Sequence, residues 1–391
     1  MKKQPQFDRI FVVLTCAVLL ACFAYCIVLA DDINSYENRP AAKVQPFSLP
    51  EFLESAWQDG LEDALMDQMP LSETLKRLYN NTNTTVLAMA MEPILENRPE
   101  RYVSFRGLEF FGGEYLCYRP KNLSDIQSGI DRRTGNLNES IEENSQADFY
   151  LYYIQCDGDV DFETGERSGI WEYLSSKMTL PQERMGCLEV PDFETYSRFF
   201  YKTDHHWNYA GAHTGYVDTA RLLGVAEEDL LQPQETMTAP LLFSGTRANT
   251  AGTDILKESF SAYRYDLPAM EVTLNGQTVE RYGVAFESYY SPDVYPGYTS
   301  YYGYDEGEVV FDTGLGGENL LVLGNSYDNA IVQLLASHFG RTHSVDLRYY
   351  ETDMGTAFDL DAYLRENEIH KVLLIGDNSY FSGDLFMMGG E

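Results

Sequence analysis

The chain has 391 residues, of which 44% are hydrophobic and 14% aromatic, and this composition excludes an intrinsically disordered protein. Its 61 acidic and 28 basic residues give a formal net charge of -33 at pH 7. Because phosphate groups are bound by clusters of Lys and Arg, this charge argues against nucleic acids and anionic lipid surfaces as partners.

The N-terminal segment predicts a membrane anchor. Residues 10–30 contain no charged side chain, and at about 1.5 Å per residue a helix over this run would cross a hydrocarbon core of about 30 Å. Basic residues precede the run and acidic residues follow it, so the positive-inside rule leaves the body of the protein outside the cytoplasm. We therefore expect residues 1–31 to be a single-pass anchor in the cell membrane. Signal cleavage after Ala30 or lipidation at Cys22 are alternatives that would also export the body.

The next segment leads into the main domain. Residues 32–50 contain several prolines and little periodic signal, which is typical of a tether. Apolar residues at helical spacing predict two helices over 52–79, broken at Pro70. Residues 80–85 are polar and are interpreted as a loop. Residues 32–85 are thus a tether with lead-in helices.

Strand and helix patterns alternate beyond this point. We predict strands within 105–118, turned at Gly112 and Gly113, and at 149–155, and helices over 122–146, 170–177, 192–199 and 209–223. Such alternation is typical of an α/β domain with a mostly parallel sheet.

Residues 225–318 interrupt this rhythm. They are rich in Tyr, Gly, Pro and acidic residues, with short alternating pieces such as 270–274, and we interpret them as an insertion with a small β element over one face of the sheet. The last part of the chain is clearer, with predicted strands at 319–324, 342–347 and 371–375 and predicted helices at 327–339 and 360–367. We therefore expect residues 86–391 to form a doubly wound, mostly parallel sheet.

The run from Asp204 to Trp207 reads Asp-His-His-Trp. If this run is extended, side chains alternate between faces, so Asp204 and His206 point the same way and His205 points away. A carboxylate next to an imidazole fixes its tautomer and supports the imidazolium that forms when the ring takes a proton. The alternative is a buried structural Asp-His pair with a packing tryptophan.

A nucleophile for such a pair is found at Ser326. It follows a predicted strand and precedes a predicted helix, where open α/β sheets place their ligands and where helix amides can stabilise an oxyanion. The alternative for Ser326 is a helix N-cap bonded to the amide of Asn329. Ser379, after the last strand, has almost the same neighbours in the sequence. Only a short segment follows it, which is a weak support for a positioned hydroxyl.

These motifs together resemble the DHHW family, which is similar to alginate O-acetylation proteins and lies in the SGNH (GDSL-like) hydrolase superfamily. The resemblance rests on residues 204–212, on Gly-Asn-Ser-Tyr at 324–327 and on 345–349, and residues 110–118 look like an early glycine-rich stretch of that group. The sequence departs from the family pattern at Asn325, where an Asp is usual, and at Glu114 and Tyr115 in the early stretch.

The resemblance implies an SGNH-like fold with Ser326, His206 and Asp204 as a catalytic triad. It also implies an exported acyltransferase or esterase that acts on O-acetyl or other O-acyl groups of a cell-envelope polysaccharide, with a membrane protein as a possible acyl donor. Substrate binding or orientation is then expected of four neighbouring residues: Trp207, Tyr327, Asn325 and Arg348.

Two other function classes stay open. One is a non-catalytic glycan-binding or scaffolding protein of the same fold. The other is a metal-dependent phosphoesterase that uses Asp204, His205 and His206, although the further carboxylates of a two-metal centre cannot be placed. The cysteines lack zinc-site spacing, so we expect no metal and no cofactor.

Overall fold

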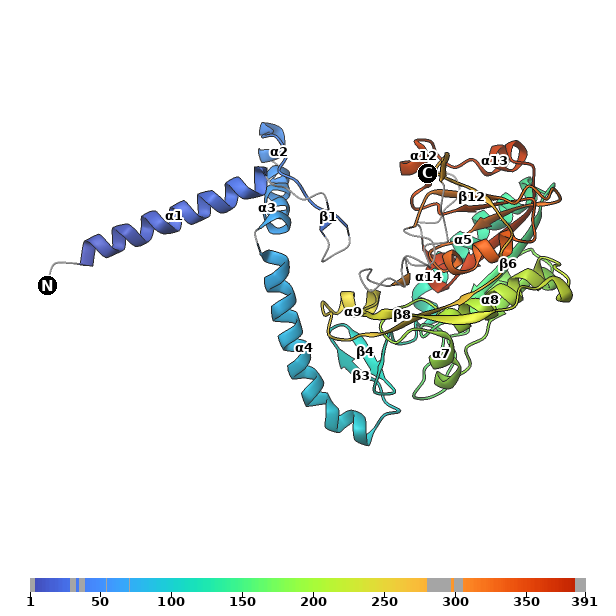
Figure 1. Cartoon of the computed structure of the whole chain (residues 1–391), viewed down its shortest axis with the longest axis horizontal. Coiled ribbons are helices and arrows are strands. Elements are labelled where there is room, and N and C mark those ends of the chain that lie inside the picture. Colours follow the sequence, from blue (N-terminus) through green and yellow to red (C-terminus); the bar gives the residue numbers. More distant parts are fainter. Residues whose placement is uncertain are drawn as a thin grey trace. The chain divides into compact units, whose positions relative to one another are not determined.

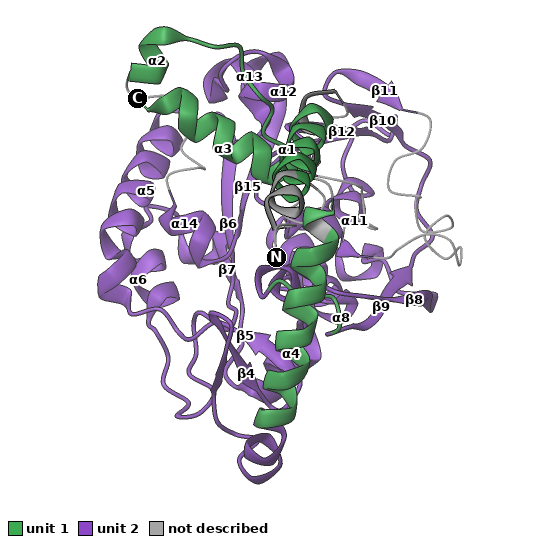
Figure 2. Cartoon of the chain, turned by 90° about the vertical axis from the view of Figure 1, so that its left-hand side faces the viewer, with its two compact units in different colours: residues 1–90, 252–255 green, residues 91–251, 256–391 purple. Residues whose placement is uncertain are grey.

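The computed structural model describes residues 4–28, 33–34, 39–53, 55–69, 71–279, 297–298 and 305–383. The chain divides into two compact units (Figure 2). Unit 1 comprises residues 1–90 and 252–255, and unit 2 comprises residues 91–251 and 256–391.

Unit 1 is mostly helical. Its elements are α1 (Gln4–Val28), β1 (Ile33–Asn34), β2 (Arg39–Pro40), α2 (Leu49–Leu53), α3 (Ala56–Gln68) and the first part of α4 (Ser72–Asn97) (Figure 1). Among the described residues, no helix combines the length and the apolar character needed to cross a membrane. The anchoring role expected of residues 1–31 therefore has no support here.

The loop expected at residues 80–85 is wrong, because these residues lie inside α4. Their polar side chains bond within the unit without ending the helix. Thr82 and Thr85 donate to the carbonyls of Leu78 and Asn81, four residues back, and the side chain of Asn81 bonds Asp254 at 2.6 Å. A polar run without Pro or Gly is compatible with a helix once its side chains have such partners.

The centre of unit 2 is a mixed sheet. In the described residues it has eight strands in the order β11-β10-β12-β14-β13-β15-β6-β7. Their bounds are β11 (Gln277–Val279), β10 (Glu271–Leu274), β12 (Glu308–Asp312), β14 (Arg341–Val345), β13 (Asn319–Leu323), β15 (Ile369–Gly376), β6 (Asp148–Ile154) and β7 (Met185–Leu188). The pairs from β14 to β7 are parallel, and the pairs from β11 to β14 are antiparallel.

Alternation along the central strands creates two cores. In β13, Leu320 and Val322 belong to one buried cluster while Leu321 and Leu323 belong to the other. Because successive side chains of a strand point to opposite faces, each face of the sheet buries its own apolar layer. This explains why these strands read as continuous apolar runs in the sequence.

Helices cover both faces. Figure 2 shows α5, α6 and α14 on one side of β6, β7 and β15, and α8 and α11 on the other. Within the described residues, the helices of unit 2 after α4 are α5 (Leu123–Glu143), α6 (Ile170–Lys177), α7 (Phe193–Phe199), α8 (Tyr209–Leu222), α9 (Thr246–Thr250), α11 (Val332–Ala336), α12 (Tyr350–Met354), α13 (Leu360–Glu366) and α14 (Asn378–Ser382). Short 3-10 turns occur at η1 (Gln182–Arg184), η2 (Glu227–Asp229) and η4 (Asp328–Ala330). This arrangement is the doubly wound α/β fold expected from the alternating pattern.

Two smaller sheets complete unit 2. One contains β3 (Val103–Phe105), β4 (Leu108–Phe111) and β5 (Tyr115–Cys117), and the other pairs β8 (Glu235–Phe243) with β9 (Glu258–Arg264). The segment 225–318 is therefore only partly a separate β element, because β10, β11 and β12 extend the main sheet itself. Antiparallel strands can be added at a sheet edge without a crossover helix. The alternation of strand and helix patterns in the sequence therefore stops although the sheet continues.

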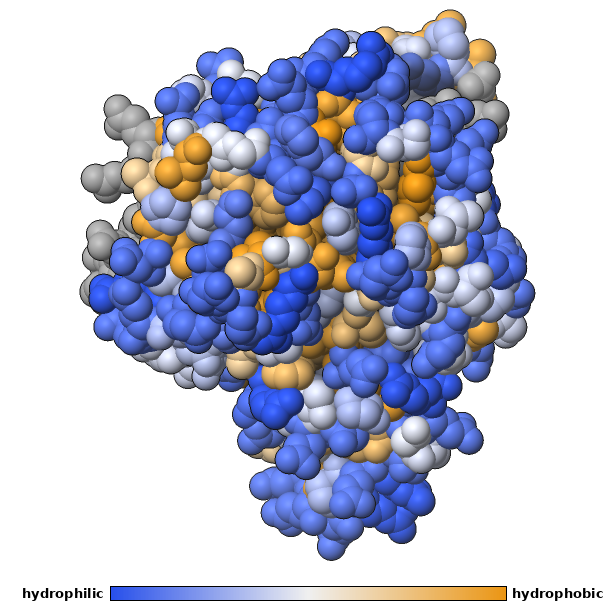
Figure 3. Space-filling model, turned by 90° about the vertical axis from the view of Figure 1, so that its right-hand side faces the viewer, coloured by the Kyte–Doolittle hydropathy of each residue, from blue (hydrophilic) through white to orange (hydrophobic). Residues whose placement is uncertain are grey.

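The helix expected at 327–339 is also different. The structure has η4, a break at Ile331 and the five-residue helix α11. All residues of α11 are buried, so the segment follows the space between the sheet and α8 rather than a regular helical path. Figure 3 shows another face of the molecule, on which hydrophilic residues dominate and apolar residues are visible between them.

Candidate active site

The Asp-His-His-Trp run lies between α7 and α8. Asn208 begins α8, and its side chain accepts bonds from the amides of Ala210 and Gly211. The amide of Asn208 donates to the carbonyl of Phe199 at 2.7 Å. A strong N-cap thus sets where the helix begins and holds the preceding loop in place.

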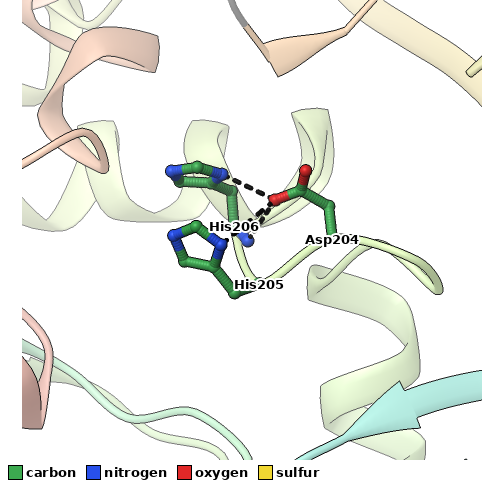
Figure 4. A group of neighbouring side chains, drawn as sticks. All are labelled: Asp204, His205 and His206. Atoms are coloured by element: carbon green, nitrogen blue, oxygen red, sulfur yellow. Dashed lines mark hydrogen bonds and ion pairs between the residues drawn. The ribbon is translucent and has the colours of Figure 1, made fainter. Parts of the chain in front are cut away.

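Asp204, His206 and Ser326 form one chain of hydrogen bonds. Asp204 Oδ1 lies 2.6 Å from His206 Nδ1, and His206 Nε2 lies 2.7 Å from Ser326 Oγ. Figure 4 shows the contact between the carboxylate and the ring. Since an ionised carboxylate only accepts hydrogen bonds, Nδ1 carries the proton and Nε2 is free to accept the serine hydroxyl. This is the geometry that general-base activation of a serine requires.

His205 does not point away from this group as expected. Its ring lies 3.8 Å from the His206 ring, and its Nδ1 lies 3.6 Å from Asp204 Oδ1 and 2.6 Å from Thr246 Oγ1. The alternation argument fails because the loop is a series of bends rather than an extended strand. Burial and the neighbouring His206 lower the pKa of His205 to about 3, so this ring is neutral at physiological pH.

Asp204 is buried and has several donors. Its Oδ1 also accepts the amide of His206 at 3.0 Å, and its Oδ2 accepts the amide of Thr246 at 2.9 Å. Burial alone raises the pKa of Asp204, but the charge and hydrogen bonds of His206 outweigh burial and hold that pKa well below its usual range. A Cβ on Gly245 would lie within 3 Å of the Asp204 Cβ, so α9 can approach only because residue 245 is a glycine.

The other face of the His206 ring is covered by Tyr298. The two rings are stacked, with centroids 3.7 Å apart and an interplanar angle of 4°. The Tyr298 hydroxyl accepts from Trp207 Nε1 and donates to the carbonyl of Tyr327, both at 3.0 Å. His206 is therefore enclosed between the rings of Tyr298 and His205.

Trp207 acts through packing. It is 0% exposed, so the substrate contact expected of it does not fit the structure. A Cβ on Gly215 of α8 would lie within 3 Å of its indole ring. The small residues of α8 thus make room for Trp207, which holds Tyr298 against the imidazole.

Ser326 lies at the carboxyl end of β13, as expected. Within the described residues its hydroxyl bonds only His206, and no cap bond to Asn329 forms. Asn325 is buried and its side chain accepts the amide of Tyr327 at 3.4 Å, so it shapes the turn. The backbone N–H of Ser326 has no partner among the described residues and could donate to an oxyanion, in place of the expected helix N-terminus.

Of the two remaining candidates, Tyr327 lies beside the triad, with its ring centroid 5.3 Å from that of His206. The Tyr327 hydroxyl donates to the carbonyl of His205 at 2.7 Å. Arg348 follows β14 and binds the carboxylates of Asp346 and Asp305. Arg348 is thus already held by two carboxylates, which orient its guanidinium.

Ser379 lies at the same edge of the sheet, because β13 and β15 are parallel neighbours. Its hydroxyl donates to Asp377 Oδ1 at 2.6 Å, and Asp377 is the N-cap of α14. Among the described residues no imidazole bonds Ser379. The sequence around Ser379 resembles that around Ser326, but in the structure it forms the cap of a helix.

Sequence reasoning missed Thr246 and Tyr298. Thr246 begins α9 just after β8, and no spacing rule connects it to residue 204. Tyr298 is one of 29 tyrosines in the chain and lies in a Tyr-rich stretch, so nothing in the local pattern distinguishes it. Residues 280–296 and 299–304 of that stretch lie outside the described residues.

In the part of the chain that the structure describes, one group of side chains could hold a metal ion, namely Asp204, His205 and His206, whose donor atoms lie within 4.8 Å of one another. Their hydrogen bonds do not fit this use well. Nδ1 of His206 bonds Asp204, Nε2 bonds Ser326, and Nδ1 of His205 bonds Thr246. A metal would have to displace at least one of these bonds.

No protein-family model and no curated protein sequence matches the chain. Solved structures with a similar fold include a DHHW family protein from Eubacterium siraeum DSM 15702, with a TM-score of 0.53, 18% identity, and coverage of 72% of this chain and 94% of that chain. They also include PatB1 from Bacillus cereus, with a TM-score of 0.53, 19% identity, and coverage of 74% and 99%. PatB1 with a sulfonyl adduct matches with a TM-score of 0.50 and 21% identity. At these identities the likeness shows the fold, and the fold is that of a DHHW family protein, as the residues 204–207 indicated.

Proposed function

We propose that this protein transfers or hydrolyses O-acyl groups of a cell-envelope polysaccharide, with Ser326 as nucleophile, His206 as general base and Asp204 as the group that orients the base. The observation that carries this proposal is the unbroken hydrogen-bond chain from Asp204 through His206 to Ser326. A buried Asp-His pair with a purely structural role has no need of a serine hydroxyl 2.7 Å from the second ring nitrogen.

The proposed reaction has two steps, acylation of Ser326 and removal of the acyl group from it. Ser326 Oγ attacks the acyl carbonyl and its proton passes to His206 Nε2. The leaving group departs with that proton, and it is the sugar oxygen in hydrolysis or the heteroatom of the acyl donor in transfer to the polysaccharide. The acyl-serine is then attacked by a second hydroxyl, whose proton passes through His206 back to Ser326 Oγ. A sugar hydroxyl gives transfer and water gives hydrolysis. The Ser326 amide would stabilise the oxyanion in both steps.

The fold supports the substrate class only by analogy. In this proposal the acyl group comes from a membrane protein, and residues 1–31 hold the catalytic unit at the outer surface of the membrane. The acyl donor is inferred from the family resemblance. The anchor is inferred from the uncharged N-terminal run and its flanking charges.

The nucleophile is tested by covalent labelling. Because PatB1 has been solved with a sulfonyl adduct, an aryl sulfonyl fluoride and a fluorophosphonate are suitable probes. Wild type and Ser379→Ala should be labelled and Ser326→Ala should not. The melting temperature of either variant should change little, since each loses one hydroxyl hydrogen bond worth about 0.5–1.5 kcal/mol. An unlabelled wild type would favour the non-catalytic glycan-binding function.

The two histidines are tested by substitution. His206→Ala should lower kcat for acetyl ester hydrolysis by several powers of ten, as for other triad members. His205→Ala should retain most of the turnover and lose stability instead, because its ring packs on His206 and bonds Thr246. Equal loss in both variants, with activity that depends on added zinc or manganese, would favour the metal phosphoesterase.

A further inference from the structure

A cavity of about 440 Å³ lies at the carboxyl ends of β13, β15 and β6. Its walls come from the turns after these three strands and from α9. The carboxyl ends of three adjacent parallel strands thus lie at one cavity. Open α/β sheets bind their ligands at this edge. All of its lining residues belong to unit 2.

The cavity begins next to the triad. His205 and Tyr327 form part of its wall. The His205 ring lies 3.8 Å from the His206 ring, and Tyr327 directly follows Ser326. A ligand in the cavity would therefore contact two residues that lie directly beside His206 and Ser326.

The lining places polar side chains around one exposed aromatic ring. Tyr118 is 45% exposed, and its backbone amide is held by Asp157 at 2.5 Å. Around it lie the ammonium of Lys121 and the hydroxyls of Thr246 and Thr250. Ligand pockets for apolar groups are lined mainly by hydrophobic side chains. Each of these groups has one partner in the chain, namely Asn378 for Lys121, His205 for Thr246 and the Thr246 carbonyl for Thr250. A long acyl chain could not satisfy their remaining donor and acceptor positions. A ring with many hydroxyls can bond them.

The charges of the lining cancel. Lys121 and Arg247 are cationic, and Asp157 and Asp377 are anionic, so two positive and two negative formal charges sum to zero. Arg247 is buried and pairs with Asp157 at 2.7 Å. The chain as a whole carries a net charge of -33. An anionic ligand would therefore approach against the overall field, whereas an uncharged ligand would not.

One donor in the lining has no partner. Arg247 is 3% exposed, and its Nε has no hydrogen-bond partner among the described residues, although both Nη atoms are bonded. Buried donors are nearly always bonded in native proteins. A hydroxyl in the cavity is a group that could accept this bond.

We propose that this cavity is the subsite for an uncharged sugar unit of the substrate, with the Tyr118 ring as its stacking platform. The proposal rests on the proposed function, because it places the sugar next to the ester that Ser326 attacks.

The experiment compares acetylated xylo-oligosaccharides, which are uncharged, with acetylated oligogalacturonides and with p-nitrophenyl acetate, which has no sugar. Wild type should have a kcat/KM at least about tenfold higher for the uncharged sugar ester than for the anionic one. Tyr118→Ala should raise the KM for the xylo-oligosaccharide ester and lower the ratio of its kcat/KM to that for p-nitrophenyl acetate at least about tenfold. Tyr79→Ala, at an exposed tyrosine of α4 that does not line the cavity, should leave both substrates unaffected. A preference for the oligogalacturonide, or an unchanged ratio in Tyr118→Ala, would overturn the proposal.

Binding separates this proposal from the catalytic one. Calorimetry of Ser326→Ala with xylotetraose and with tetragalacturonate needs no turnover. Binding of xylotetraose that is lost in the Ser326→Ala and Tyr118→Ala double variant supports the subsite even if wild type hydrolyses no ester, in which case only the catalytic function fails. Turnover of p-nitrophenyl acetate without xylotetraose binding would leave the catalytic function standing and overturn the subsite.

Discussion

At the scale of single residues, the imidazole of His206, the proposed general base, is held by more than its carboxylate. Asp204 bonds one edge of the His206 ring, while Tyr298 and His205 cover its two faces. A general base works only when its nitrogen is aimed at the proton it takes. Tyr298 stacks parallel to the ring, so it restricts rotation of the ring and thereby keeps Nε2 directed at Ser326.

We expect Tyr298→Leu to lower kcat about 10- to 100-fold, because small misplacements of a catalytic group have effects of this size. Tyr298→Phe keeps the ring that stacks on His206 and loses only the bonds to Trp207 and Tyr327, so its loss should be smaller. The kcat and KM for an acetyl ester, measured across pH, check this. If Tyr298 only stabilises the fold, both variants will melt earlier while kcat and its pH profile stay as in wild type.

At the scale of elements, α8 supports the site by approaching Trp207 closely. Gly215 lies where any larger residue would meet the indole ring. In α5, by contrast, nothing lies within 4 Å of a Cβ built on Gly135. Substitution of the two helical glycines by alanine therefore tests the contact with Trp207, with Gly135 as the control.

Gly215→Ala should destabilise the protein by about 1–3 kcal/mol, because it overpacks a filled core. Gly135→Ala should stabilise it by ~0.5–1 kcal/mol, since alanine is the better helix former and nothing obstructs its methyl group. Urea unfolding monitored by circular dichroism checks both values. Equal effects of the two substitutions would show that contact with Trp207 does not determine the role of Gly215.

The turn after β13 adds a pH dependence to stability. Asp328 is buried in η4, where it accepts a bond from Ser344 Oγ at 2.8 Å. Burial, with added repulsion from Asp346 and Asp305, raises its pKa to about 8. An unfolded aspartate titrates near ~3.9, so between roughly pH 4 and pH 8 the folded state binds the extra proton. This group therefore lowers the free energy of unfolding as the pH rises through that range.

Asp328→Asn keeps an oxygen that can accept from Ser344 and removes the titration. The variant should melt higher than wild type at pH 8.5, by roughly 2–4 °C for each kcal/mol. The difference should shrink towards pH 5. Melting curves across this range check the sign, and a difference that does not vary with pH would contradict the assignment to Asp328.

At the scale of the whole molecule, the proposed site and the uncharged N-terminal run belong to different units. Every residue of the triad, its stacking partners and the sugar subsite belongs to unit 2. The uncharged N-terminal run belongs to unit 1. If that run is an anchor, attachment and chemistry are carried by different parts of the chain.

A chain that begins at Ile33 should therefore keep the esterase kcat/KM of the full-length protein. The full-length protein should sediment with membranes, and the shortened one should remain in the supernatant. N-terminal sequencing of the membrane-extracted protein completes the test, because a mature chain that starts at Asp31 or at a modified Cys22 would contradict an uncleaved anchor.

Local patterns were sufficient for much of the fold. The strands and helices of the α/β part follow from alternation, helical periodicity and caps such as Asn208. The position of Ser326 at the carboxyl end of a strand, and the pairing of Asp204 with His206, could be predicted because each depends on neighbours in the sequence.

The tertiary structure decided what depends on contacts between distant segments. The bend that stacks His205 on His206, the short buried α11 in place of a longer helix, and the approach of Thr246 to Asp204 all result from packing that overrides local preference. Tyr298 and the cavity beside the triad exist only because strands and loops far apart in the chain meet at one edge of the sheet. A sequence pattern predicts the periodicity and caps of one helix or strand. A site of this kind forms where several elements meet, so the pattern of any single element does not predict it.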